Sequence, residues 1–258
     1  MGAQTVGGAG VSGVWSWLTD PAHWTGDQGI PHLLEEHLVI SCWAMLLAVA
    51  VAVPVAVLAG HFGRGGALLV AVGNIGRAIP TYAVIVILAL TDQIGVGALA
   101  VVLALALFAL PPMLVNTYVA MREVDPDVKD AARGMGMTGG QLLRRVELPL
   151  SFPLTFAGFR TAFVQVVATA TFGALVGAGT LGQIIVTGFS VQNYDEMYAG
   201  VVLVALLCIG IDLALAGIQR LVARRTGQVP RGRSRRGPGL AVTADEAVAA
   251  LPVPASAG

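Results

Sequence analysis

The sequence has 258 residues, of which 56% are hydrophobic and only 12% are charged, and its formal net charge is zero. A soluble domain usually carries about 25% charged residues, so the composition excludes an ordinary soluble domain. The apolar residues come in long blocks, and the ranges 94–120 and 161–192 contain no Asp, Glu, Lys or Arg. Because a helix needs about 20 such residues to cross a bilayer, the sequence predicts an all-α polytopic membrane protein.

The positive charges are distributed unevenly along the chain. All 15 Lys and Arg residues come after position 63, whereas acidic residues already occur before it. Short loops rich in Lys and Arg remain on the cytoplasmic side of a membrane. Residues 1–37 are therefore expected outside, with a short amphipathic helix over about 30–39 that lies in the membrane interface. A first span, about 38–59, then runs inward and ends near Arg64.

Four further apolar segments continue this alternation. The inner ends of the spans carry Arg64, Arg122 and Arg220, and the outer loops carry no Lys or Arg. This pattern predicts a transmembrane domain over 38–222 with about five spanning helices, the N-terminus outside and the C-terminus inside. The expected second to fifth spans cover about 67–88, 96–119, 150–174 and 198–218.

The last segment, 223–258, is rich in Arg, Gly, Pro and Ala and shows no periodicity. Such a composition predicts a disordered cytoplasmic tail. Its arginine cluster either contacts anionic membrane lipid or serves only to anchor the topology.

The main polar insertion, 122–149, is expected to form a helix-turn-helix on the cytoplasmic side. Asp125 and Pro126 favour the start of a helix, because proline is well tolerated in a first helical turn. Glycines then interrupt the pattern before a short second helix over about 141–147. The expected breaks are Gly134, Gly136, Gly139 and Gly140, and Pro149 is expected to end the second helix.

This insertion resembles the EAA loop of the permeases of ABC importers. The matching pattern is Asp130-Ala131-Ala132, then Gly136 four residues on, then Val146 and the pair Leu148-Pro149. Asp130 stands where the pattern usually has Glu, a change that keeps the charge. The resemblance implies that the loop forms a coupling helix, which docks on a separate ATP-hydrolysing subunit; the alternative is an ordinary amphipathic loop. The candidate coupling residues are Asp130, Ala131, Ala132, Gly136, Leu142, Leu143, Val146, Leu148 and Pro149.

The resemblance extends over roughly residues 15–222. The stretches 17–24, 74–83, 110–118, 158–162 and 175–185 are similar to the glycine betaine, carnitine and choline permeases. Thr180 and Gln183 stand where that subfamily often has Gly and Asp. The resemblance implies the type I ABC-importer fold, a location in the bacterial plasma membrane, and import of a quaternary-ammonium osmoprotectant. A cargo such as ergothioneine or an amino acid, for example methionine, remains an alternative.

The same resemblance implies the partners and excludes a cofactor. We expect an ABC ATPase subunit, a second permease that is either identical or related, and an external substrate-binding protein. The chain has no G-x-x-x-x-G-K-[ST] phosphate loop, and its only lysine is Lys129. ATP and Mg²⁺ are therefore expected on the partner ATPase, and no cofactor or nucleic acid is expected on this chain.

Two other functional classes are disfavoured. An ion-driven secondary transporter often shows internal repeats and midplane acids, whereas no repeat is visible here and Asp212 is the only acid within a span. A membrane enzyme needs a metal site or a nucleophile–base motif. The four histidines have no metal-ligand spacing, so we expect no catalytic residue and no metal.

Three charged residues, Arg77, Arg160 and Asp212, are expected inside the membrane. A charge at the bilayer centre costs about 2.5–3.5 kcal/mol on insertion scales, so such residues face protein or water. Arg160 and Asp212 lie at similar depth, and we expect them to pair or to join one polar network; the alternative is that Arg160 snorkels to the headgroups. Asn74, Pro80 and Asn116 are candidates to line the translocation path, or are ordinary sites of helix packing.

Overall fold

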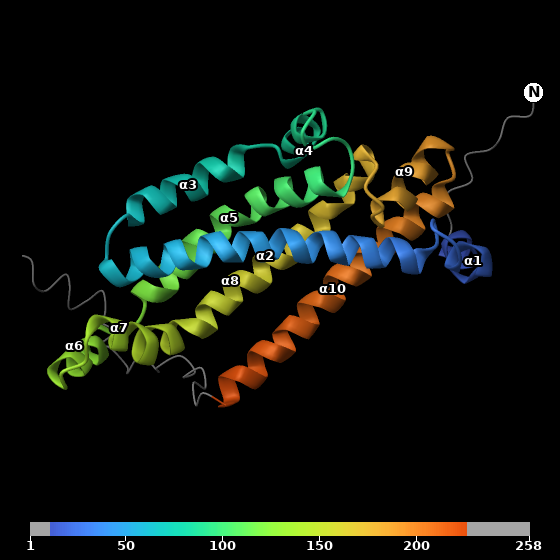
Figure 1. Ribbon diagram of the computed structural model, residues 1–258. Coiled ribbons are helices and arrows are strands. Elements are labelled where there is room, and N and C mark those ends of the chain that lie inside the picture. Colours follow the sequence, from blue (N-terminus) through green and yellow to red (C-terminus); the bar gives the residue numbers. More distant parts are fainter. Residues whose placement is uncertain (1–10, 226–258) are drawn as a thin grey trace, which may run out of the picture. The chain divides into compact units, whose positions relative to one another are not determined.

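The computed structural model describes residues 11–225, and the side chains within them except those of Val11, Arg77 and 222–225. The described residues form helices and connecting turns, and those up to Val222 belong to one compact unit. The predicted tail over 223–258 lies outside the described residues, apart from the end of the last helix. The elements in Figure 1 are α1 (Val11–Thr19), η1 (Pro21–Trp24), α2 (Ile30–Phe62), α3 (Gly66–Ala78), α4 (Thr81–Ala89), α5 (Ala98–Arg122), α6 (Pro126–Gly134), α7 (Gly139–Leu142), η2 (Leu143–Glu147), α8 (Leu148–Thr169), η3 (Ala170–Val176), α9 (Gly182–Ser190) and α10 (Tyr194–Arg225).

The core of the unit is the contact of α2 with α5 and of α5 with α8. Alanine recurs every fourth residue along one face of α2, and all four of these side chains are fully buried. Small residues at such a spacing let helix backbones approach closely in a membrane, where van der Waals packing is the main attraction. The alanines are Ala44, Ala48, Ala52 and Ala56.

The structure merges two elements that the sequence separated. The short interfacial helix expected over 30–39 is not separate, because it forms the first turns of the continuous helix α2. Residues 32–53 contain no glycine or proline to interrupt the helix. Its early residues Leu33 and His37 are both buried, so they face protein rather than the membrane interface.

The second span is broken near its middle. Helices α3 and α4 are bent by 79° relative to each other, and Pro80 lies at the break with its own φ of −65°. Both halves pack on α5. Counting this pair as one span, the described residues hold five helical spans, and four without it, which agrees with the expected number.

The two ends of the bundle differ in charge. At one end Gly63 closes α2 in the left-handed conformation, and a Cβ placed on it would meet the guanidinium of Arg122. The loops that carry Arg64 and Arg122 therefore lie together. At the other end the Leu181 N–H donates to His37 Nδ1 at 3.3 Å, so Nε2 carries the proton that His37 donates to the Val167 carbonyl at 2.8 Å.

This histidine joins the start of α2 to the segment that leads into α9. Only an outer loop was expected between the fourth and fifth spans, and α9 within it was not predicted. Because residues 177–197 contain no Lys or Arg, the end of the bundle at His37 lacks the positive charges that gather at the other end.

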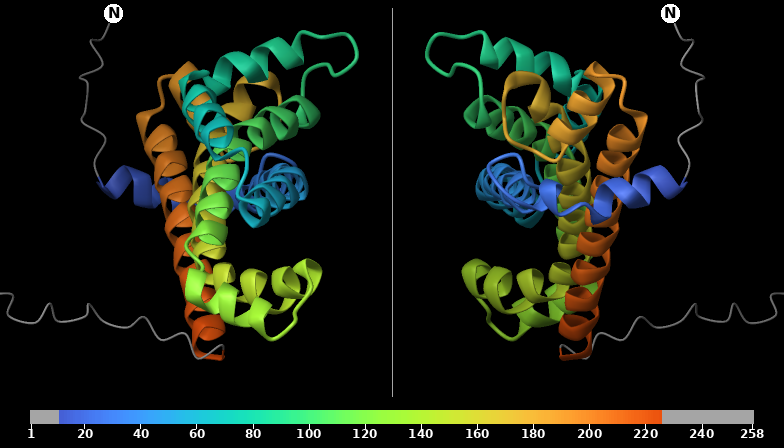
Figure 2. Two further views of the ribbon diagram at one scale, coloured as in Figure 1. Left: turned by 90° about the vertical axis from the view of Figure 1, so that its left-hand side faces the viewer. Right: turned by 90° about the vertical axis from the view of Figure 1, so that its right-hand side faces the viewer.

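Helix α10 confirms the fifth span but is poorly covered by the rest of the chain. Only 6% of its apolar stretch is buried. Figure 2 shows α10 beside α8, with α8 between α10 and α2. Most of its apolar surface is therefore left for lipid or for another subunit.

Candidate functional site

The first helix of the polar insertion starts where the sequence predicted. The Asp125 side chain accepts a hydrogen bond from the Asp127 N–H at 2.9 Å, and Pro126 follows as the first helical residue. Asp125 thereby satisfies one of the free N–H groups at the start of α6. The helix is short and ends at Gly134.

Gly136 closes α6 in a left-handed turn. Its φ is +84°, its N–H donates to the Arg133 carbonyl at 2.9 Å, and the Met137 N–H donates to the Ala132 carbonyl at 3.2 Å. These two bonds form a Schellman motif, which favours glycine at the left-handed position. No atom lies within 4 Å of a Cβ built on Gly136, so a larger residue is opposed by backbone strain rather than by a clash.

The second half of the insertion differs from the prediction. Gly139 and Gly140 do not break the chain but begin α7, where Thr138 and Gln141 form a capping box. Pro149 does not end the helix either. The backbone widens into a π-turn over Leu143–Glu147, and Pro149 lies in the first turn of α8, where its missing N–H is tolerated.

The candidate coupling residues divide into a buried and an exposed group. Ala132 and Leu142 are buried, each with 2% exposure, and fix the insertion to the bundle. Asp130, Ala131 and Gly136 are exposed, and Asp130 pairs with Arg133 at 2.9 Å on the surface. Of the remaining candidates, Leu143 and Val146 are half-buried, and Leu148 and Pro149 are exposed.

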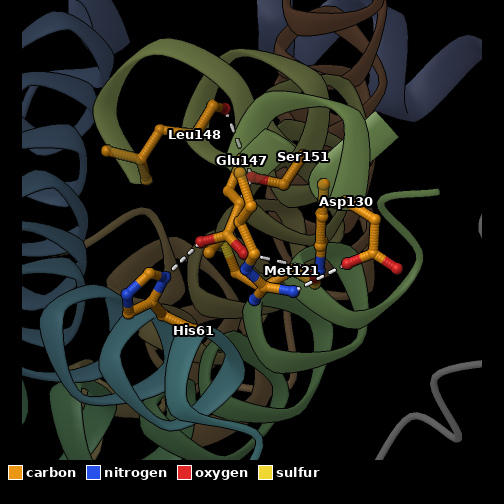
Figure 3. Close-up of polar contacts among 8 residues, drawn as sticks. His61, Met121, Asp130, Glu147, Leu148 and Ser151 are labelled. Carbon is orange, nitrogen blue, oxygen red and sulfur yellow. Dashed lines mark hydrogen bonds and ion pairs between the residues drawn. The ribbon is translucent and has the colours of Figure 1, made fainter. Parts of the chain in front are cut away.

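A polar cluster beneath the insertion was not predicted. Glu147 is only 1% exposed, and its carboxylate contacts His61 Nδ1 and lies 3.5 Å from Lys129 Nζ. Figure 3 shows this carboxylate facing the imidazole of His61. Lys129 Nζ also donates to the carbonyl of Met121 at 3.1 Å, and Ser151 Oγ lies 3.2 Å from Met121 Sδ. One signal was available in the sequence, since Lys129 is the only lysine of the chain.

A polar groove lies between α3, α5 and α8. Its volume is about 520 Å³, and Asn116 of α5 and Thr161 and Gln165 of α8 supply its polar side chains. A Cβ on Gly158 would meet Asn116, so this glycine allows α8 to approach α5 here. The sequence singled out Asn116 but missed Thr161 and Gln165, although Gly158, Thr161 and Gln165 follow a helical spacing. Asn74 and Pro80 are exposed and do not line the groove.

The intramembrane charges are brought together in part. Arg160 Nε donates to Asp212 Oδ1 and Arg160 Nη2 donates to Asp212 Oδ2, each at 2.6 Å, in a bidentate ion pair between α8 and α10. Their contact was predicted from their similar depth. The side chain of Arg77 lies outside the described part of the chain. A second polar contact joins the same helices, from Gln219 Nε2 to the Pro153 carbonyl at 3.4 Å.

Residues 52–228 match a family described as the inner membrane component of binding-protein-dependent transport systems. The chain belongs to this family. It is therefore a multi-pass membrane permease and not an enzyme, since ATP hydrolysis in these importers is the task of a separate subunit.

Two relatives illustrate the similarity in sequence. The permease is 37% identical over 196 residues to the choline transport system permease protein OpuBD of Bacillus subtilis, covering 74% of this chain and 86% of the relative. It is 34% identical over 184 residues to the carnitine transport permease protein OpuCB of Listeria monocytogenes, covering 71% and 84%.

Solved structures confirm the type I ABC-importer fold. An inward-facing conformation of the MetNI methionine ABC transporter superposes with a TM-score of 0.66 at 26% identity, covering 75% of this permease and 95% of that chain. An amino acid ABC transporter solved with histidines superposes with a TM-score of 0.59 at 18% identity, covering 75% and 92%, and shows the fold alone.

The ion pair predicts a stability effect. Asp212→Asn leaves the Arg160 guanidinium within the membrane-spanning part of the chain without its carboxylate, and it removes the ion pair that joins α8 to α10. We expect the purified permease complex to unfold at a lower temperature in detergent, measured by thermal denaturation. Arg220→Gln, an exposed change on the same helix, is the control and should leave the melting temperature unchanged. An equal melting temperature for Asp212→Asn and wild type contradicts this role of the pair.

Proposed function

We propose that this permease forms the translocation path of an ATP-driven importer for quaternary-ammonium osmoprotectants. The observation that carries the proposal is the 37% identity to a choline permease, together with 34% identity to a carnitine permease. Choline, carnitine and glycine betaine share a trimethylammonium group. The similarity to the methionine transporter is lower, at 26% identity, so an amino-acid cargo is the second candidate.

The exposed face of the insertion supports a role in docking the ATPase. Val128 and Met135 of this face are 41% and 74% exposed, and Asp130 and Ala131 lie beside them. An apolar patch with a charged border is typical of a surface that binds another protein. ATP binding on the partner then draws α6 toward its counterpart and tilts the permease. Such contacts must differ between the two states, because a partner shifts an equilibrium only by its differential affinity.

The charge pattern supports the orientation of the permease. The end of the bundle at Arg64 and Arg122 is placed in the cytoplasm by the positive-inside rule, with the insertion. The opposite end, where α9 lies, faces outward and receives the external substrate-binding protein. In this proposal an external segment, 1–37, precedes the transmembrane domain, 38–222, and a cytoplasmic tail follows from 223.

The polar groove is the proposed location of the translocation path. Asn116, Thr161 and Gln165 carry no charge, so they can exchange hydrogen bonds with a polar cargo without trapping it as a fixed carboxylate would trap a cation. The groove is open on one side of a single copy. A second permease, facing it across the path, closes it.

The proposed function predicts the outcome of an uptake experiment that tests cargo and coupling together. Cells lacking the gene are compared with cells carrying the intact gene, at low and high osmolarity, for uptake of labelled choline and glycine betaine. We expect uptake only with the intact gene. The Gly136→Val variant should lose this uptake. A left-handed φ costs a non-glycine residue about 1–2 kcal/mol, and relief of this strain displaces the end of α6.

Gly140→Val is the matched control, since Gly140 is exposed and its φ is not left-handed. Uptake by the Gly136→Val variant equal to that of wild type contradicts the coupling role of the insertion. If cells with and without the gene take up both compounds equally, the proposed cargo changes to ergothioneine or an amino acid, and the family stays the same.

A second prediction concerns the groove. Asn116→Leu keeps the side-chain size but removes the amide, so uptake per ATP hydrolysed should fall while the complex still assembles. Asn74→Leu makes the same change at an exposed position outside the groove and should have little effect. Uptake and ATP hydrolysis are both measured in reconstituted vesicles that contain each variant. A larger loss from Asn74→Leu than from Asn116→Leu places the path elsewhere.

A further inference from the structure

We propose that Glu147 is a positioning residue that transmits the movement of α6 to the transmembrane helices through its ion pair with Lys129. The proposal rests on the proposed docking of the insertion to an ATPase. It adds the physical link by which a force on the insertion reaches the bundle.

Helix α6 touches the rest of the permease along a narrow line. Every residue of Pro126–Gly134 is exposed except Lys129, which is half-buried, and Ala132, which is buried. These two residues are three positions apart and share one face of the helix. Ala132 supplies a single methyl group to this contact, so Lys129 provides the only polar attachment between α6 and the described bundle beneath it.

The Glu147 carboxylate, which pairs with Lys129, is connected to three transmembrane helices. Glu147 lies directly before α8, it contacts His61 in the last turn of α2, and Lys129 also bonds to the Met121 carbonyl in the last turn of α5. The inner ends of α2, α5 and α8 therefore meet at one pair of charges; Figure 3 shows Glu147, His61 and Met121 of this cluster.

Burial makes this link stiff. The Glu147 side chain is 1% exposed and that of Lys129 is 12% exposed, so little water reaches either partner when they separate. An unpaired charge in such a place is strongly unfavourable. Helix α6 is thus forced to move with the helix ends rather than to slide over them.

The backbone alone provides a weaker connection. Between α6 and α7 the chain leaves the helical conformation over residues 135–138 and passes through the left-handed turn at Gly136. A π-turn over Leu143–Glu147 then precedes α8. Such wide turns occur frequently at functional sites, and here the π-turn ends on the residue that holds Lys129.

The test uses the complete transporter, reconstituted in vesicles with its ATPase and binding protein. Three variants are compared with wild type for choline or glycine betaine uptake per ATP hydrolysed: Lys129→Met, Glu147→Leu and the double variant. Glu123→Gln, an exposed acid of the same insertion, is the control. We expect each single variant to lower the ratio by about fivefold or more, as for other couplings between distant sites, while ATP hydrolysis continues.

The double variant separates coupling from folding. It leaves neither charge of the Lys129–Glu147 pair, so thermal stability should recover toward wild type, whereas the uptake-to-hydrolysis ratio should stay as low as in the single variants. Recovery of the ratio together with stability overturns the proposal, because the pair would then be structural only.

Comparison with Gly136→Val distinguishes the two proposals. A wild-type ratio in Glu147→Leu, with uncoupling in Gly136→Val, overturns the link and leaves the docking role of the insertion in place. A wild-type ratio in all of these variants contradicts both.

Discussion

A carboxylate that is removed from water must find partners, and Glu147 is removed from water where the insertion meets the bundle. It contacts His61 and Lys129, which belong to helices far apart in the sequence. Removing one partner of a buried ion pair costs about 3–5 kcal/mol, a large part of the stability of a typical domain. In the proposed mechanism the position of α6, and with it the surface that docks on the ATPase, depends on this contact together with the burial of Ala132 and Leu142.

The remaining architecture divides the permease into a tightly packed and an open side. On the packed side, the alanine face of α2 lies against α5, and His37 fixes the end of the bundle opposite Arg64 by two hydrogen bonds. On the open side, the Arg160–Asp212 ion pair and the contact of Gln219 with the Pro153 carbonyl join α10 to α8, and the groove at Asn116 is open. A rigid half that presents an incomplete path is consistent with a transporter in which two permeases tilt against each other.

The sequence predicted the features that follow from composition and local chemistry. The number of spans, the start of α6 at Asp125 and the break in the helix at Gly136 all rest on hydropathy, capping and backbone conformation, which act over a few residues. The predictions of a separate helix over 30–39 and of a helix end at Pro149 were wrong, because tertiary burial and a π-turn override these local signals. The Glu147 cluster joins residues up to 86 positions apart, and no spacing rule reaches that far.

The docking of α6 is tested most directly by cross-linking from two neighbouring alanines. Cys42 and Cys208 are first replaced by serine, and a single cysteine is then placed at Ala131, which is exposed, or at Ala132, which is 2% exposed. With cysteines on the ATPase surface, position 131 should cross-link to that subunit in the assembled complex, and position 132 should not. Equal cross-linking at both positions, or none at 131, would contradict the proposed orientation of the insertion.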